Sequence, residues 1–419
     1  MNSPSRVPTD WRDAARQQRL RRRYAAERRF RLLGLGAILL SAGFLAFLLV
    51  TMALKGASGF VHAEVRLDID FARSAIFLDP AMLKGENAAT AVGAADVDTP
   101  IAAAATAQLG AEGVRLLSDT AAQTVRRAIL ADPSILTRQA SLWLPASSGL
   151  DAAAKDGDDP RMGPVYARLK QSGRVRTGFN GAFLSSADAT DPASVGIWGA
   201  FKGSLLTMIV TLALAFPIGV LSAVYLEEYA PRNRWTDMIE VSINNLAAVP
   251  SIIFGLLGLA VFLNTMNLPR SAPLVGGLTL ALMTMPVIVI ASRNAIKSVP
   301  PSIRDAALGV GASKIQVVFH HVLPLALPGI LTGTIIGMAR ALGETAPLLM
   351  IGMRAFIAAP PGDLAEPATV LPVQIFLWSD EVSRGFVEKT SAAILVLLAF
   401  LMAMNGIAIY LRNKFEKRW

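Results

Sequence analysis

Six long apolar runs dominate the pattern of hydrophobic and polar residues along this chain. Each approaches or exceeds the roughly 18–20 residues that an α-helix needs to cross a bilayer. The fifth run differs from the others because it contains two charged residues, Arg340 and Glu344. The pattern predicts an all-α membrane protein with six transmembrane helices, at residues 32–54, 203–226, 241–263, 271–292, 325–351 and 390–411.

The longest polar interval separates the first two apolar runs and covers residues 55–198. It begins with apolar and polar residues in strict alternation from Val61 to Phe71, which is typical of a half-buried β-strand. An alanine-rich stretch with helical spacing follows. The interval is long enough to bury its own core. It therefore predicts an inserted domain of α+β or mainly helical structure, and we find no catalytic constellation in it.

Composition and basic residues define the class and the orientation of the chain. Hydrophobic residues make up 53% of the sequence, and the mean hydropathy is +0.47, which is too apolar for an ordinary soluble protein. Basic residues are concentrated in residues 1–31 and in the tail 412–419, and they recur in 227–240 and 293–324. The positive-inside rule then predicts that both termini are cytoplasmic and that residues 55–198 lie on the outer face.

The net charge of +9 has a simple explanation in this topology. Basic segments next to membrane spans orient the protein and attract anionic lipid head groups, so membrane lipid is an expected partner. A nucleic-acid partner is not expected, because the arginine-rich segment adjoins the first span directly. The chain has no cysteine, which excludes disulfides and thiolate chemistry.

The two charges in the fifth run lie four residues apart, so one helical face can carry both. Small residues precede them at intervals of four, at Gly329, Gly333 and Gly337. Such a stripe lets a neighbouring helix approach closely. Two interpretations remain open. Arg340 can offer a forked cation to an oxyanion while Glu344 orients it, or the pair can lock this span to its neighbour. Pro347 is expected to bend or end the helix.

The third run contains Pro250 followed by Ser251. Proline frees a backbone carbonyl near the middle of the span, and the serine hydroxyl can line a polar path. Asn244 and Asn245 lie nearer the cytoplasmic end, where an interhelical hydrogen bond is the simpler interpretation.

The polar segment between the fourth and fifth runs carries a distinctive spacing of small, acidic and proline residues. It predicts two short helices joined by a sharp turn at Gly311, with Pro324 ending the second helix. The segment resembles the coupling loop of ATP-binding-cassette importer permeases, which docks on a cytoplasmic ATPase. The residues that carry this resemblance are Asp305, Ala306, Ala307, Gly311, Leu323 and Pro324.

A wider resemblance covers about residues 200–411. The segments Val249–Leu256, Ala339–Leu348 and Leu371–Phe376 are similar to those of phosphate-specific importer permeases of the A-subunit type. The resemblance implies a type I importer core over residues 199–411, with inorganic phosphate as cargo. It implies a translocation path or gate that involves Arg340, Glu344, Ser251 and Thr345.

The same resemblance implies an inner-membrane location and several partners. These are a homologous second permease, a dimer of ATPase subunits and a periplasmic phosphate-binding protein. The chain has no Gly-x4-Gly-Lys-[Ser/Thr] phosphate loop, so we expect a transporter subunit and not an enzyme, with ATP and magnesium on the ATPase partner. The alternatives are a permease for molybdate, sulfate or phosphonate, and a membrane receptor that senses through residues 55–198. A receptor would need a cytoplasmic output domain, and the inner segments are short.

Overall fold

A computed structural model describes residues 14–74, 76, 88–156, 160–353, 356–357 and 359–415. The chain divides into two compact units, Met1–Leu54 and Lys55–Trp419. Helix α1 (Ala14–Gly59) supplies the described part of the first unit and includes the predicted first span. The helix begins well before that span, because the arginine-rich segment contains strong helix formers and neither glycine nor proline interrupts it. Residues 1–13 and 416–419 of the predicted basic ends lie outside the described residues.

The predicted strand at the start of the inserted domain is confirmed. Strand β1 (Val61–Asp70) pairs antiparallel with β2 (Gln139–Pro145) and β3 (Val175–Phe179), which gives the sheet order β2-β1-β3. The alternating side chains of β1 point into the core, where Val65, Leu67 and Ile69 are fully buried. The helices of this domain are α2 (Ala88–Ala94), α3 (Asp98–Leu109), α4 (Ala121–Ala131), α5 (Ser148–Asp156), α6 (Gly163–Gln171) and α7 (Gly181–Ser185). The insertion is therefore an α+β domain.

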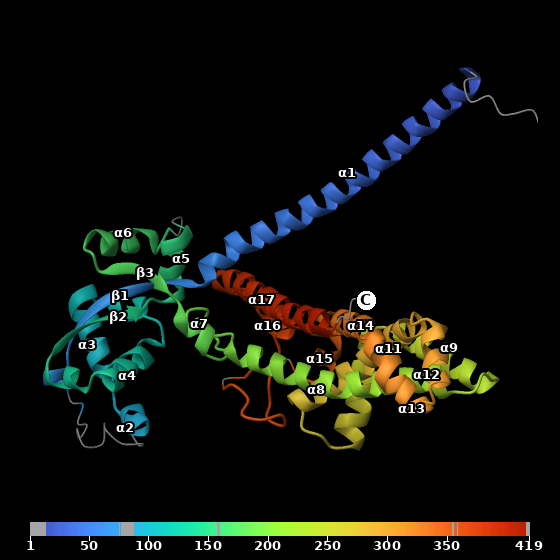
Figure 1. The fold of residues 1–419 in the computed structure, drawn as a ribbon. Helices are drawn as coiled ribbons and strands as arrows, with labels where there is room; N and C mark the ends of the chain where they lie inside the picture. The colour runs from blue at the N-terminus through green and yellow to red at the C-terminus, as the bar shows by residue number, and fades with distance from the viewer. Residues whose placement is uncertain are drawn as a thin grey trace, which may run out of the picture. The chain divides into compact units, whose positions relative to one another are not determined.

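Long apolar helices form the rest of the second unit (Figure 1). The most buried of them is α11, which packs against α8 and α14. The elements in chain order are α8 (Trp198–Val224), a π-helical segment (Tyr225–Tyr229), α9 (Arg234–Ala247), α10 (Ser251–Gly258), a second π-helical segment (Leu259–Thr265), α11 (Pro273–Lys297), α12 (Pro301–Gly309), α13 (Lys314–Gln316), a third π-helical segment (Val317–Val322), α14 (Leu323–Gly343), α15 (Ala346–Met350), α16 (Leu371–Ser379) and α17 (Arg384–Phe415).

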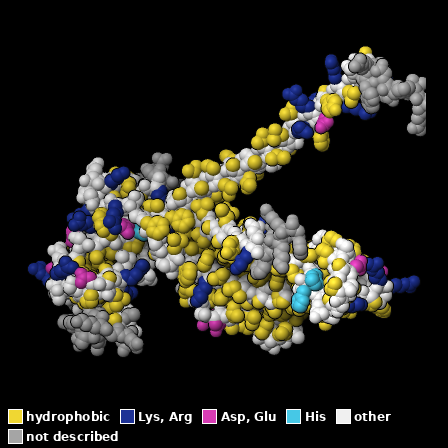
Figure 2. Space-filling view, viewed as in Figure 1, with side chains coloured by type: hydrophobic (Ala, Val, Ile, Leu, Met, Phe, Trp, Pro, Cys, Tyr) yellow, Lys and Arg dark blue, Asp and Glu magenta, His cyan; other side chains and the backbone are white. Residues whose placement is uncertain are grey.

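The number of possible membrane spans agrees with the prediction, but one of the predicted spans is bent. Among the described residues, five helices are long and apolar enough to cross a membrane, and a bent pair raises the total to six. Figure 2 shows hydrophobic side chains over most of the long helices, whereas charged side chains gather on the inserted domain, at the arginine-rich end of α1, and where α8, α9 and α12 lie. The fold is that of an all-α membrane protein with an α+β insertion.

The third predicted span, 241–263, is not one straight helix. Two helical segments, Arg234–Ala247 and Ser251–Thr265, meet at an angle of 98°. Pro250 lies at the break with ψ of 135°, far from the helical value. Its ring would clash with the carbonyl of Leu246 in a continuous helix, and it has no N–H to donate. The proline therefore does more than free one carbonyl, since it redirects the chain.

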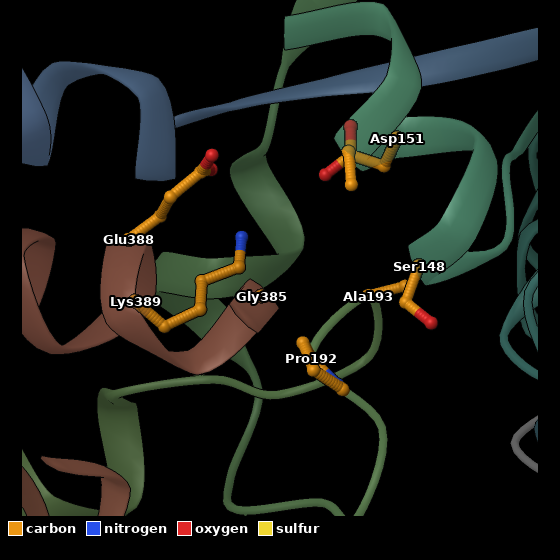
Figure 3. Close-up of a pocket in the computed structure, with 8 residues that line it drawn as sticks. Ser148, Asp151, Pro192, Ala193, Gly385, Glu388 and Lys389 are labelled. Carbon is orange, nitrogen blue, oxygen red and sulfur yellow. The ribbon is translucent and has the colours of Figure 1, made fainter. Parts of the chain in front are cut away.

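An ion-pair cluster joins the inserted domain to the N-terminal end of α17. Lys155 lies 2.8 Å from Asp151 and 2.7 Å from Glu388, and its side chain is only 10% exposed. Asp151 also accepts a hydrogen bond from the backbone N–H of Ala63. Lys389 donates to the carbonyl oxygen of Gly59 at 3.0 Å. Figure 3 shows Asp151 from α5 and Glu388 and Lys389 from α17 around one pocket.

Lys155→Met should destabilise this junction strongly. Burial alone would lower the pKa of Lys155, but the Asp151 and Glu388 carboxylates raise it above its usual value, so the lysine is charged at neutral pH. Its contribution is lost only when the pH rises through this elevated pKa. Removing the cation leaves two carboxylates unpaired, at a cost of about 3–5 kcal/mol. Thermal unfolding of the purified full chain measures the loss.

The matched control for this variant is Lys170→Met. Lys170 is exposed on α6 and its Nζ lies 5.7 Å from the centroid of the Tyr166 ring, so its loss should change stability by no more than about 1 kcal/mol. Equal melting temperatures for the two variants would contradict the role assigned to Lys155.

Candidate functional site

The predicted pair of charges lies where α14 ends. Helix α14 stops at Gly343, and Glu344 follows it with ψ of 122°. The prediction that Arg340 and Glu344 share a continuous helical face is therefore wrong. Pro347 explains the difference, because its ring would clash with the carbonyl of Gly343 in a continuing helix. The same proline shortens the predicted span 325–351 and places α15 in a separate element.

The two charged side chains nevertheless contact each other. Arg340 Nε lies 3.5 Å from Glu344 Oε1. The Arg340 side chain is 47% exposed and that of Glu344 is 20% exposed. One carboxylate can occupy only part of a guanidinium with five N–H donors. Arg340 therefore keeps donors available for an anion or for a partner subunit.

The other two predicted path residues lie on elements that border this helix end. Ser251 is the first residue of α10, directly after the break at Pro250, and Thr345 precedes α15. Helices α10 and α15 pack closely at Gly255, where a Cβ atom would lie only 2.6 Å from the Cα of Pro347. The contact brings together the two segments with interrupted helices. Non-helical backbone at membrane depth is tolerated where protein buries it or where it lines a cavity.

Gly255 was not among the predicted site residues. Its position one helical turn after Ser251 could have suggested a role near the path. The residue that occupies the space beside it, Pro347, lies far away in the sequence. Only the folded arrangement pairs the two.

The glycine stripe of α14 lies against α11. A Cβ atom on Gly329 would lie 2.7 Å from the Cβ of Ala295, and one on Gly333 would overlap the Cβ of Ala291. At Gly337 a Cβ would lie 3.0 Å from Cγ2 of Thr284. The absence of side chains at these positions allows α14 to approach α11 along three turns.

The third segment of the sequence resemblance, Leu371–Phe376, forms the start of α16. The backbone N–H of Leu371 donates to Oγ of Ser204 on α8 at 2.8 Å. Gly203 makes this approach possible, because a Cβ there would overlap the carbonyl oxygen of Thr369. A serine hydroxyl from another helix thus satisfies one of the free N–H groups at the α16 N-terminus.

The predicted coupling loop consists of α12, a sharp turn and α13. Gly311 has φ of +88°, and its N–H donates to the carbonyl oxygen of Leu308 at 2.9 Å. The N–H of Ala312 donates to that of Ala307 at 3.1 Å, which completes a Schellman motif. Ser313 and Gln316 then form a capping box that starts α13. The turn at Gly311 is where the sequence placed it.

Pro324 does not end the second helix. The chain is helical from Lys314 to Gly343, with Leu323 and Pro324 at the beginning of α14. The π-helical segment Val317–Val322 comes directly before them. A π turn changes the backbone pairing ahead of the proline, and this accommodates the missing N–H without a break.

The surface of this loop is unusually apolar. Ala307 is buried, whereas Asp305 and Ala306 are exposed. Four large apolar side chains on α12, the turn, α13 and the following π-helical segment are exposed as well, with Val310 at 86%. An exposed apolar cluster at a polar membrane boundary is typical of a protein–protein contact. The four residues are Leu308, Val310, Ile315 and Phe319.

Comparison with known proteins matches two parts of the chain to family models. Residues 17–163 match a domain of unknown function (DUF3333), and residues 200–418 match the binding-protein-dependent transport system inner membrane component. A probable ABC transporter permease of Bacillus subtilis, YqgI, is 32% identical over 252 residues, which cover 55% of this chain and 84% of that protein. The phosphate transport system permease PstA of Yersinia pestis is 30% identical over 227 residues, covering 54% and 75%.

Among solved structures, the chain is similar to the MetNI methionine ABC transporter in an inward-facing conformation. The match has a TM-score of 0.43 and 18% identity, and it covers 53% of this chain and 98% of that one. The family model alone spans more than half of the chain and includes all the predicted path and coupling residues. The chain therefore belongs to the family of binding-protein-dependent transport system inner membrane components, the permease subunits of ABC transporters.

Proposed function

We propose that this chain is the permease subunit of an ATP-driven importer and forms half of a translocation path for inorganic phosphate. The observation that carries the proposal is the half-exposed guanidinium of Arg340 at the end of an interrupted helix. A forked, permanently charged donor suits a tetrahedral oxyanion. The similarity to PstA of Yersinia pestis, a phosphate transport permease, supports phosphate over other oxyanions.

In this mechanism Arg340 binds the phosphate oxygens when the path opens. Glu344 orients the guanidinium and limits how long the anion stays, because it competes for the same donors. The hydroxyl groups of Ser251 and Thr345 add neutral donors from the neighbouring breaks. The second half of the path comes from a homologous permease, and a periplasmic phosphate-binding protein delivers the cargo.

The coupling loop, residues 293–324, connects this path to ATP hydrolysis. We infer that Leu308, Val310, Ile315 and Phe319 dock on a dimer of cytoplasmic ATPase subunits, which binds ATP and magnesium. Asp305 to Pro324 then move as the ATPase dimer closes, and they tilt α11 and α14. In the proposed topology the basic ends 1–31 and 412–419 are cytoplasmic, and residues 55–198 lie outside the bacterial inner membrane.

Gly311→Val should uncouple the loop from transport. A Cβ at Gly311 meets nothing within 4 Å, so the effect comes from the positive φ alone. Left-handed backbone costs a residue with a Cβ roughly 1–2 kcal/mol, which favours a rearranged turn. We expect ATP hydrolysis to continue while transport per ATP falls. Gly309→Ala is the control, because Gly309 is helical and equally free of neighbours. Normal coupling in Gly311→Val would contradict the docking role of the turn.

The experiment that tests the function is uptake of radiolabelled phosphate by cells that lack this chain, with and without its restoration. Sulfate and molybdate serve as competing cargo. Restored uptake of phosphate alone supports the proposal. Restored uptake of another oxyanion keeps the importer and replaces the cargo. No uptake of any oxyanion, with the chain and its partners present in the membrane, would favour a receptor.

A further inference from the structure

The inner end of α8 carries two adjacent acidic residues in an unusual backbone. Glu227 and Glu228 lie in the π-helical segment Tyr225–Tyr229 that continues α8. Negative charge is unfavourable at a helix C-terminus, where the unpaired carbonyl groups already carry partial negative charge. The two acids therefore do not stabilise α8 by themselves. Their partners lie on other elements.

Glu228 binds the first helix of the coupling loop. Nη2 and Nε of Arg304 on α12 lie 2.7 and 3.0 Å from Oε1 of Glu228. The same guanidinium donates to the carbonyl oxygens of Val299 at 2.6 Å and Ile296 at 3.0 Å. Arg304 thus connects the end of α8, the end of α11 and the start of α12. The side chains of Glu228 and Arg304 are 12% and 21% exposed, so water screens the pair poorly.

Glu227 points to a second arginine. Arg293 on α11 lies 3.4 Å from Glu227 and 2.9 Å from Glu240 on α9. Two neighbouring acids of one π-helical segment therefore contact arginines on two different elements. Lys297 is peripheral, since it is half exposed and lies 3.7 Å from Glu227.

The ion pair between Arg304 and Glu228 lies close in sequence to the exposed apolar cluster proposed to dock on the ATPase. Arg304 directly precedes Asp305. The exposed apolar cluster of the loop begins at Leu308, four residues after Arg304. A force applied to that cluster reaches α12 first. Among the described residues, the ion pair from Arg304 to Glu228 is the direct polar link from α12 to α8.

We propose that Glu228 and Arg304, supported by Glu227 and Arg293, form a clamp that makes the coupling loop and the inner end of α8 move as one body. This inference rests on the proposed importer function and adds α8 to the helices that the ATPase drives. Glu228 and Arg304 are positioning residues, because neither touches the cargo. Without the clamp, α12 would move while α8 lagged behind, and the path would open incompletely.

Glu228→Gln tests the clamp in the complete reconstituted transporter. The amide keeps the shape and removes the charge, so assembly and ATP hydrolysis should persist. ATP hydrolysed per cargo molecule imported should rise about tenfold, within the usual range of coupling between sites. Arg270→Gln, which removes an exposed cation outside the coupling loop, is the control and should leave the ratio unchanged. An unchanged ratio in Glu228→Gln would overturn the proposal.

A double-variant comparison separates the pair from general loss of packing. Arg304→Gln also loses the bonds to two carbonyl groups, so its own effect should be larger. If the clamp acts through the pair, Glu228→Gln should add little to Arg304→Gln, since the interaction is already absent. Fully additive effects on the ATP-to-cargo ratio would count against it.

A distance measurement keeps the test independent of cargo and of variant folding. The chain has no native cysteine, so spin labels can be attached at Arg232→Cys and Ser302→Cys, two exposed positions on either side of the clamp. In the otherwise unchanged transporter, the distance should stay constant when ATP binds, and Glu228→Gln should broaden it. A distance that shifts with ATP in the unchanged transporter would refute the clamp, whatever the cargo proves to be.

Discussion

Phosphate uptake should fall by roughly two orders of magnitude or more when Arg340 is replaced by alanine, while the assembled transporter remains intact. Truncating one partner of a charged hydrogen-bonded contact costs about 2–5 kcal/mol. The Arg340 side chain is 47% exposed and contacts Glu344 at a marginal 3.5 Å, so the chain's own fold depends little on it. Uptake of labelled phosphate, together with recovery of the complex by affinity purification, separates transport from assembly.

Two further variants sharpen this prediction. Arg340→Lys keeps the charge and loses the fork, so uptake should be intermediate. Glu344→Gln frees the guanidinium and should bind phosphate more tightly while releasing it more slowly. If Arg340→Ala instead prevents recovery of the complex, the pair serves packing between helices, and the oxyanion role is refuted.

Gly333→Leu should prevent correct packing of α14 on α11. The position has no space for even one carbon atom, because a Cβ there would overlap the Cβ of Ala291. Overpacking in a tight interface costs about 1–3 kcal/mol for small additions, and a branched side chain at a backbone contact should reach at least the upper end. The measurement is the thermal stability of the detergent-purified complex and the fraction that assembles.

The same interface offers a control and a rescue. Gly343→Ala adds a methyl group at the exposed end of α14, where a Cβ meets nothing within 4 Å, and should be tolerated. Gly333→Ala should be harmful alone and milder when combined with Ala291→Gly, because that change removes the atom it overlaps. Equal stability of Gly333→Leu and Gly343→Ala would show that α14 does not pack on α11 in this register.

Local patterns predicted those parts of the fold that depend on neighbours in sequence. The alternation after Val61 predicted β1, because a strand with one buried face places every second side chain in the core, and this pattern is visible in the local sequence. The turn was predicted at Gly311 because glycine, which has no Cβ, readily adopts the left-handed backbone of a sharp turn between two helices. The apolar runs predicted the spans because bilayer thickness determines their length.

The remaining features depend on residues far apart in the chain. The pairing of Glu228 with Arg304 could not be assigned, because several acids and bases lie in the polar segments 227–240 and 293–324. The contact between Gly255 and Pro347 needs two broken helices side by side. Arg340 and Glu344 were predicted to meet for a reason that proved incorrect, since α14 ends between them and a flexible side chain completes the contact instead.

The junction that involves Lys389 has a consequence for biosynthesis. Lys389 donates to the carbonyl oxygen of Gly59, 330 residues earlier in the chain, and Glu388 contacts Lys155 across 233 residues. Chains are made from the N-terminus at about 5–20 residues per second. The inserted domain thus emerges and can fold well before the segment that anchors it exists. Its final attachment waits for insertion of the last helix, so a ribosome stalled before residue 388 holds a domain with a vacant docking face.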